Sequence, residues 1–220
     1  PELTIYTCVR DGQDHIFDAV RSATTISANN TSVEYVLVDD CSRDETLTRI
    51  AECGIGANGN SWLRLVLNEE NLGLASSSNV ALSEAKGKYV MRLDADDVLA
   101  FPDFTENYHA LMQPLKEGGQ AVYPAYYLVK DGVRNGRPID PRLHHHAGGA
   151  VFDRAFLNEL RFRDGLRHWD GLELYNRIRK LGVNVGYLDS PTWCYRQRDG
   201  SMSRTDPEER EALRKELEER

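Results

Sequence analysis

The chain has 220 residues, of which 40% are hydrophobic and 28% charged, and its formal net charge is -8 at pH 7. This length is sufficient for one sizeable core, and an acidic balance without a long Lys/Arg cluster disfavours nucleic acid as a partner. The four cysteines lack the spacing of a zinc site or disulfide framework, and no apolar run approaches the roughly 18 residues of a membrane span. We therefore expect a cytoplasmic domain, with peripheral membrane attachment or a place in a longer polypeptide left open.

The first hundred residues alternate between strand-like and helix-like segments. Apolar, β-branched runs typical of strands buried in a parallel sheet lie at 3–9, 33–38, 62–67 and 88–93. Apolar residues at helical spacing occur over 13–28, 42–53 and 74–86. Ser42 to Glu45 has the pattern of a capping box, and Pro102 suits the first turn of a helix that reaches Lys116. Repeated strand and helix units predict a doubly wound sheet with right-handed crossovers.

The second half changes character. A tyrosine-rich hairpin is expected over 121–129, with its turn at Asp131-Gly132, followed by a polar loop over 134–149. Further elements are predicted as a strand at 150–152, helices at 153–160 and 169–181, short strands at 183–188 and 192–196, and a charged helix at 207–220.

Three carboxylates, Asp94, Asp96 and Asp97, end the fourth strand-like run. Unpaired buried charges cost several kcal/mol each, so these acids are expected at a strand end. Carboxylates with Asp-x-Asp spacing can share a hard divalent cation that also binds phosphate oxygens. The alternative is a polar turn without a ligand, which is the usual role of an isolated Asp-x-Asp.

Polar residues follow three of the predicted strands. They are Thr7 to Arg10, Asp39-Asp40 and Asp94 to Asp97. Because ligands of doubly wound sheets bind at the carboxyl ends of the strands, these residues are expected to gather at one edge. A preference for polar residues in turns does not by itself explain why three strands end in polar or acidic residues at the same edge.

The order of these motifs resembles the GT-A glycosyltransferases, specifically family 2, whose members are mostly inverting enzymes that use sugar nucleotides. The likeness begins at Val36 to Thr46, which is similar to the family's VVDDgStDgT block, and continues with Asn71-Leu72-Gly73 and with Leu93 to Asp97. Trp169 to Arg177 resembles the acceptor-side helix, and Tyr195-Arg196 resembles the closing motif. The resemblance covers nearly the whole chain and implies a Rossmann-like, mixed but mainly parallel α/β sheet flanked by helices.

The resemblance also implies donor-side roles. The nucleotide base would be lined by Thr7, Val9 and Arg10 and would donate a hydrogen bond to Asp39. Asp94 would lie near the ribose and the metal, and Asp96 would be the principal ligand of Mn²⁺ or Mg²⁺ on the donor diphosphate. The other donor-side positions that match the family are Asn71, Gly73, Asn79 and Ala95, and a further donor-side candidate, Arg198, departs from it. Arg198 stands where many members have His, and because a guanidinium pairs with phosphate but does not ligate metal, it is expected to hold the diphosphate.

An acceptor hydroxyl needs a carboxylate to take its proton as the new bond forms. Asp170 is the candidate base, and Glu173 is the alternative. The chain departs from the family here, because Asp170 falls where the motif has Glu and Gly171 falls where it has the usual catalytic Asp. We expect Asp170 to serve from the helix start with its side chain exposed to the cleft; the other reading is that it is only an N-cap.

Aromatic and imidazole side chains are further candidates for the acceptor side. Trp169 is a candidate to stack on an acceptor sugar or, equally, to act as a hydrophobic staple at the helix entrance. His145 and His146 can touch the acceptor or complete a metal shell, although loop histidines are commonly solvated. The hairpin tyrosines are expected to pack against their neighbours.

These features predict one domain over 1–220, with a nucleotide-binding half at 1–100, an acceptor-side half at 101–205 and a charged helix at 206–220. The expected activity is inverting, metal-dependent transfer of a sugar from a nucleoside diphosphate to a hydroxyl of a glycan or lipid-linked acceptor. A catalytically silent domain that binds sugar nucleotide or glycan is the first alternative, because of Gly171. A nucleotidyltransferase is the second, although Thr7 to Gly12 is poor in the Gly and Lys of its usual loop.

Overall fold

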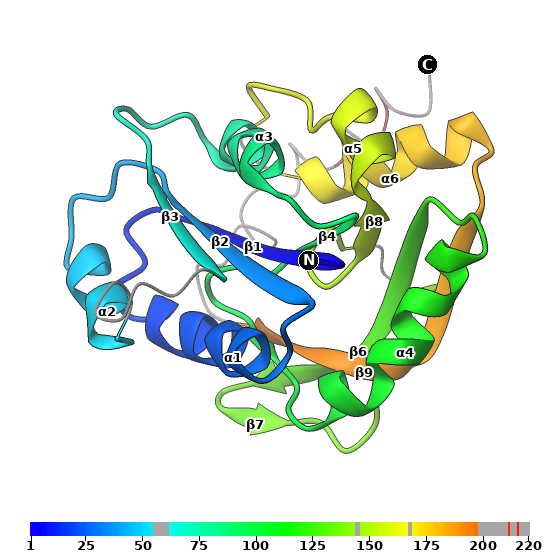
Figure 1. Cartoon of the computed structure of the whole chain (residues 1–220), viewed down its shortest axis with the longest axis horizontal. Helices are drawn as coiled ribbons and strands as arrows, with labels where there is room; N and C mark the ends of the chain where they lie inside the picture. Colours follow the sequence, from blue (N-terminus) through cyan, green and yellow to red (C-terminus); the bar gives the residue numbers. More distant parts are fainter. Residues whose placement is uncertain (55–61, 144–145, 167–168, 198–210, 212–214, 216–220) are drawn as a thin grey trace.

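A sheet of nine strands runs through the described part of the chain, with helices on both faces (Figure 1). The computed structural model describes residues 1–54, 62–143, 146–166, 169–197, 211 and 215. The strand order is β3-β2-β1-β4-β8-β6-β9-β5, and β7 pairs with β6 beside this path. The expected mixed α/β fold is confirmed.

Four parallel strands form the first half of the sheet: β1 (Leu3–Val9), β2 (Val33–Asp39), β3 (Leu63–Leu67) and β4 (Tyr89–Arg92). They are connected by three helices, α1 (Ile16–Asn29), α2 (Thr46–Glu52) and α3 (Leu74–Glu84). Val9 lies opposite Asp39, and Tyr6 lies opposite Arg92. The carboxyl ends of β1, β2 and β4 therefore meet at one edge of the sheet.

The second half contributes the strands β5 (Val98–Leu99), β6 (Ala121–Lys130), β7 (Val133–Arg134), β8 (Val151–Asp153) and β9 (Val185–Gln197). Its helices are α4 (Asp103–Lys116), α5 (Arg154–Leu160) and α6 (Asp170–Leu181). Strand β8 is antiparallel to both β4 and β6, and it joins the first parallel group to the parallel pair β6 and β9. The prediction of two short strands at 183–188 and 192–196 is wrong, because β9 bulges opposite Pro124 and Ala125 instead of ending.

Alternate residues of the central strands pack against different helices. On β1, Leu3 and Ile5 belong to an apolar cluster with residues of α1 and α4, whereas Tyr6 and Cys8 belong to a cluster with residues of α3, α5 and α6. Figure 1 shows α1 and α2 on one side of the first strands and α3 on the other. Because successive side chains of a strand point to opposite faces, both faces of this sheet are buried.

The second helix begins differently from the prediction. The expected capping box over Ser42 to Glu45 is wrong, since Asp44 Oδ1 accepts the N–H of Thr46 at 3.0 Å. The Ser42 hydroxyl instead accepts the N–H of Asp11 at 3.0 Å, and the Asp11 carboxylate accepts the N–H of Arg43 at 2.7 Å. These bonds tie the loop after β1 to the loop after β2 at the carboxyl edge.

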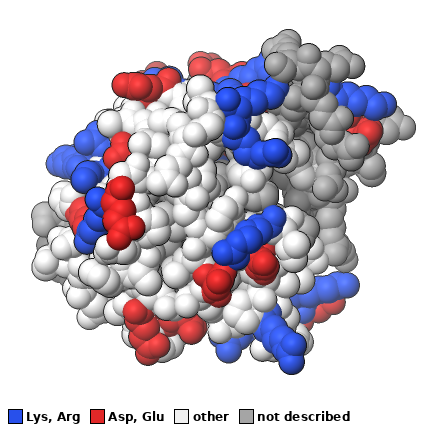
Figure 2. Space-filling model, turned by 90° about the vertical axis from the view of Figure 1, so that its right-hand side faces the viewer, with Lys and Arg blue, Asp and Glu red and all other residues white. Residues whose placement is uncertain are grey.

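The surface and the chain end bear on two further predictions. On the face shown in Figure 2, Lys and Arg side chains are interspersed with Asp and Glu and form no continuous basic area. None of the helices in the described ranges is long and apolar enough to cross a membrane.

The charged helix predicted at 206–220 lies outside the described residues, apart from 211 and 215.

Candidate functional site

Two buried aspartates, the last residue of β2 and the residue after it, lie at the carboxyl edge of the sheet. Asp39 Oδ2 accepts the N–H of Ser42 at 3.1 Å, whereas its buried Oδ1 has no hydrogen-bond partner in the described part of the chain. The Asp40 carboxylate is engaged by the N–H groups of Leu72 at 2.8 Å and Gly73 at 2.9 Å. A buried acceptor without a donor is costly, so a ligand N–H that reached Asp39 Oδ1 would be stabilised there.

The loop that Asp40 holds contains two predicted donor-side residues. Asn71 Oδ1 accepts the N–H of Gly73 at 3.2 Å, and Gly73 has a φ of 82° at the start of α3. A Cβ on Gly73 would meet nothing within 4 Å, so glycine is required here by the backbone angle and not by space. The structure therefore brings Asn71 and Gly73 to the same edge as Asp39.

The three residues predicted to line the base differ in exposure. Thr7 is completely buried, and its hydroxyl donates to the carbonyl of Leu93 at 2.8 Å, which ties the end of β1 to the residue before the acidic turn. Val9 is 3% exposed and packs in the core. Only Arg10 is partly exposed, with its Nε 3.4 Å from Asp11 Oδ2. Arg10 is thus the one of the three whose side chain reaches the surface.

The acidic turn follows β4 directly. The N–H of Asp97 donates to the carbonyl of Asp94 at 3.0 Å, and Ala95 packs against the core. Burial, opposed by Arg92 and reinforced by the Asp96 carboxylate, raises the pKa of Asp94, and burial also raises the pKa of Asp96. Crowded carboxylates of this kind are stabilised by a cation.

Asp97 has a structural role in the turn. It is completely buried, and its Oδ1 accepts the backbone N–H of Arg196 at 2.8 Å. Arg196, on β9, also donates from Nε to the carbonyl of Asp96 at 2.5 Å and pairs through Nη1 with Asp18 at 2.8 Å. Arg196, which belongs to the predicted closing motif, therefore holds the acidic turn in place, although it lies 99 and 100 positions after the two residues that it binds.

The candidate base is buried. Asp170 begins α6 and is 7% exposed, so the prediction that its side chain is exposed to the cleft is wrong. The physical reason is an ion pair, since Asp170 Oδ2 binds Nη1 of Arg92, a residue that is itself 5% exposed. Nε of the same guanidinium lies 2.8 Å from Asp94 Oδ1. One arginine thus joins the acidic turn to the start of α6.

The neighbours of Asp170 explain how α6 enters the site. A Cβ on Gly171 would lie only 2.8 Å from the backbone nitrogen of Ala147, so this loop occupies the space where the family's carboxylate would begin. Trp169, and not Asp170, is at the N-cap position, with a φ of 61° and no side-chain capping bond. The alternative base, Glu173, is 3% exposed and pairs with Nε of Arg177 at 2.8 Å.

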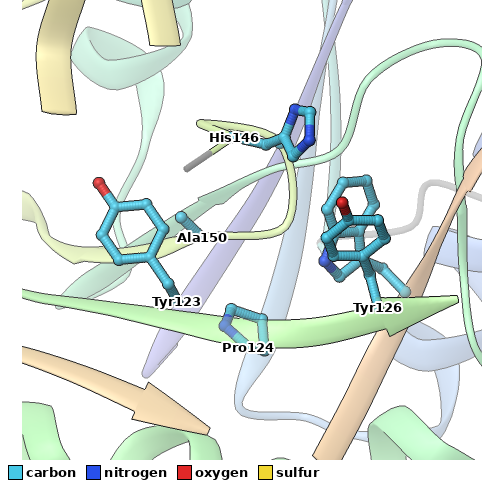
Figure 3. A pocket seen from close by; sticks show the side chains of 7 residues that line it. Tyr123, Pro124, Tyr126, His146 and Ala150 are labelled. Atoms are coloured by element: carbon cyan, nitrogen blue, oxygen red, sulfur yellow. The ribbon is translucent and has the colours of Figure 1, made fainter. Parts of the chain in front are cut away.

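A small aromatic pocket of about 10 Å³, room for about one water molecule, includes Gly148, which lies beside Asp94 Oδ2. Figure 3 shows Tyr123 and Tyr126 on either side of Pro124, with His146 and Ala150 facing them. The His146 ring lies 4.9 Å from the ring of Tyr195 and 5.5 Å from that of Tyr126. The prediction that the hairpin tyrosines pack is confirmed for Tyr123 and Tyr126, which contact neighbouring aromatic rings and also line this pocket.

The side chain of Asn79, a predicted donor-side residue, uses both its oxygen and its nitrogen in hydrogen bonds within the protein. Its Oδ1 accepts the N–H of Phe162 at 3.0 Å, and its Nδ2 donates to the Phe162 carbonyl at 2.9 Å and to Asp164 at 3.1 Å. These bonds pin the loop before α6 to α3. His145 and Arg198 lie outside the described residues.

Sequence reasoning missed Arg92 and the use of Asp40 as a loop anchor. The signal for Arg92 was available, because a single arginine interrupts the apolar run from Tyr89 to Leu93 beside an acidic motif. Buried cations are almost always paired, so an acidic partner was to be expected. The sequence did not show that Asp170 is one of these acidic partners, because it lies far from Arg92 in the chain.

The acidic turn has the carboxylates needed to bind a divalent cation whose other ligands come from substrate oxygens. The described residues contain no group of three or more His, Cys, Asp or Glu side chains that could enclose a metal ion. Gly148 leaves one oxygen of Asp94 open, since a Cβ there would lie 2.7 Å from Asp94 Oδ2. Mg²⁺ is commonly held by one or two carboxylates together with substrate phosphates, and Asp94 and Asp96 fit that pattern.

The mixed sheet with helices on both faces has the GT-A fold, because solved structures of glycosyltransferases with this fold superpose on the chain. S. aureus TarS in complex with UDP-GlcNAc aligns with a TM-score of 0.75 at 19% identity, over 99% of this chain and 65% of that one. The mannosyltransferase PcManGT from Pyrobaculum calidifontis, in complex with GDP-Man and Mn²⁺, aligns with a TM-score of 0.72 at 18% identity, over 92% and 59%.

Residues 5–196 match the family described as glycosyl transferase family 2, and the chain belongs to this family. It is 25% identical to the succinoglycan biosynthesis protein ExoO of Rhizobium meliloti over 229 residues, 93% of this chain and 63% of ExoO. It is 27% identical to WfgD of Escherichia coli, a UDP-Glc:alpha-D-GlcNAc-diphosphoundecaprenol beta-1,3-glucosyltransferase, over 81% of this chain and 74% of WfgD. A third relative, the putative teichuronic acid biosynthesis glycosyltransferase TuaG of Bacillus subtilis, is 33% identical over 73% of this chain and 59% of TuaG.

Proposed function

We propose that the chain transfers a sugar from a nucleoside diphosphate donor to a hydroxyl of a glycan or lipid-linked acceptor, with inversion and with Mn²⁺ or Mg²⁺. The observation that carries the proposal is the gathering of Asp39, the Asp94–Asp96 turn and Asp170 around the carboxyl ends of β2 and β4. Family membership supports it, as do the UDP-GlcNAc and the GDP-Man with Mn²⁺ in the two similar structures. The name of WfgD supports a lipid diphosphate acceptor, and with such an acceptor the reaction would take place at a membrane surface.

On the donor side, the nucleotide base is assigned to Asp39, whose buried Oδ1 has no hydrogen-bond donor among the described residues. Arg10, Asn71 and Gly73 border this place in our proposal. Asp94 and Asp96 would hold the cation, which when bound supplies positive charge that stabilises the departing diphosphate.

On the acceptor side, the acceptor oxygen forms a bond to the anomeric carbon while the bond from that carbon to the diphosphate oxygen breaks. The acceptor proton passes to a carboxylate within hydrogen-bond reach. We assign this role to Asp170 and not to Glu173, because Asp170 is joined through Arg92 to the donor-side turn, whereas Glu173 is paired with Arg177 within α6.

A thermal-shift screen of UDP-, GDP- and dTDP-sugars, each with and without Mn²⁺, tests donor binding, because a ligand that binds the folded state raises its Tm. One nucleotide should raise Tm, and more strongly with Mn²⁺. Transfer from that donor to a lipid diphosphate saccharide should be lost in Asp170→Asn while the donor still raises Tm. The absence of both a shift and transfer for every donor would refute the proposal.

A catalytically silent binding domain is the second candidate, and one observation favours it. Both carboxylates available as the base, Asp170 and Glu173, are buried in ion pairs. The silent domain predicts a Tm shift with one donor, no transfer by the parent protein, and the same Tm shift in Asp170→Asn. Transfer by the parent protein excludes it.

A further inference from the structure

We propose that Arg92 is a positioning residue for sugar transfer: its guanidinium holds the base, Asp170, at a set place relative to Asp94 on the donor side. This inference rests on the proposed function. It assigns to Arg92 a role that acts through Asp170 and needs no contact with substrate.

The first step in the argument is the burial of Arg92. It ends β4 and is 5% exposed, with its Cζ 5.6 Å from the centre of the Phe162 ring. Its guanidinium lies between the carboxylates of Asp94 and Asp170. A cation is tolerated inside a protein only with such partners.

The second step is that two different nitrogens of one rigid group are used. Nε pairs with Asp94 Oδ1 at 2.8 Å, and Nη1 pairs with Asp170 Oδ2. Nη1 donates a hydrogen bond to Asp170, whereas the contact of Nε with Asp94 is an ion pair without a hydrogen bond. Because a guanidinium is planar and rigid, unlike the single ammonium group of lysine, one side chain still sets how the two carboxylates lie relative to each other.

The third step is that the backbone of Arg92 is itself held firmly. It lies opposite Tyr6 in the parallel ladder, and its carbonyl accepts the N–H of Gly149 at 2.8 Å. Asp170, by contrast, is the first residue of α6 and has no place in the sheet. The strand residue is the firm end of this link, and it positions the helix residue.

Stability alone does not account for this arrangement. A buried ion pair costs desolvation free energy, and well-packed apolar residues are often as stable in its place. The three groups join the two sides of the proposed reaction, since Asp94 belongs to the donor side and Asp170 to the acceptor side. A base misplaced by about 1 Å can cost roughly 100-fold in rate, so the link has a catalytic reason to exist.

The test compares Arg92→Lys with Arg154→Lys. Arg154 is a matched control, because it is a partly buried arginine on α5 whose Nε donates to the carbonyl of Gly87. The probes are the donor identified by the thermal-shift screen, Mn²⁺ and a lipid diphosphate saccharide. We expect Arg92→Lys to lose about 100-fold in kcat with the donor KM within about threefold, and Arg154→Lys to keep both.

A second readout needs no catalysis. Because Arg92 acts through Asp170, the urea midpoint of Arg92→Lys/Asp170→Asn should fall less than the sum of the two single changes. If Arg92→Lys does not fold, Arg92→Gln, with a planar hydrogen-bonding end group, replaces it in both measurements. A kcat loss below threefold, a loss confined to donor KM, or additive urea shifts would overturn the inference. Failure of the parent protein to transfer sugar would instead count against the proposed function, and the urea comparison would still test the link.

Discussion

Gly171→Ala tests the claim that the loop at Ala147 fills the place of the family's carboxylate. Alanine in place of glycine inside a helix is worth up to about 1 kcal/mol, which alone predicts a more stable protein. The new Cβ, however, would lie 2.8 Å from the Ala147 nitrogen and 3.1 Å from its Cβ, and overpacking of this kind costs about 1–3 kcal/mol. We expect a net loss of about 1–2 kcal/mol in the free energy of unfolding.

Urea unfolding followed by circular dichroism measures this loss, and thermal unfolding should show a Tm lower by roughly 2–8 °C. Gly136→Ala is the control, because a Cβ there would meet nothing within 4 Å, and it should change stability by less than about 0.5 kcal/mol. Gly171→Asp, which restores the family's carboxylate, should destabilise at least as much and should not raise the rate of transfer. A Gly171→Ala protein more stable than the parent would refute the reasoning.

Three further predictions concern other parts of the fold. Asn79→Ala should lower the free energy of unfolding by about 2–3 kcal/mol in urea, because it leaves the buried N–H of Phe162 without its acceptor; a loss under about 0.5 kcal/mol would contradict this. Burial raises the pKa of the Cys8 thiol from 9.0 to about 12, so the thiol ionises in the unfolded chain first and stability falls as pH rises above about 9. By about pH 10 the parent should have lost about 1.4 kcal/mol more than Cys8→Ala, and equal losses would refute the assignment. Asp39→Asn should weaken donor binding about tenfold by calorimetry with Tm nearly unchanged, and unchanged affinity would remove Asp39 from the donor site.

Local patterns predicted the elements whose partners lie near in sequence. The β-branched, apolar run in Leu3 to Val9 and the apolar run in Val33 to Val38 identified two central strands, because strand propensity is a property of a few consecutive residues. The acidic turn was likewise predicted at a strand end, since three carboxylates cannot continue a buried strand. The edge that carries the candidate site therefore followed from local chemistry and one rule of sheet topology.

Features that depend on distant contacts were not predicted. Asp170 was expected to be exposed, because nothing near it in sequence announces the guanidinium of Arg92, 78 positions earlier. Two short strands were predicted at 183–188 and 192–196, whereas pairing with β6 carries one strand, β9, across a bulge. In both cases a partner from another part of the sheet outweighed the local signal.

The hold of Arg196 on the acidic turn has a consequence for recombination between relatives. Its backbone N–H and its Nε bind Asp97 and Asp96, which stand 99 and 100 positions before it. A recombination junction anywhere between Asp97 and Arg196 would combine the acidic turn of one parent protein with the Arg196 segment of another. Chimeras that inherit both segments from a single parent should keep the shape of the turn, and this pairing gives a practical guide for choosing junctions.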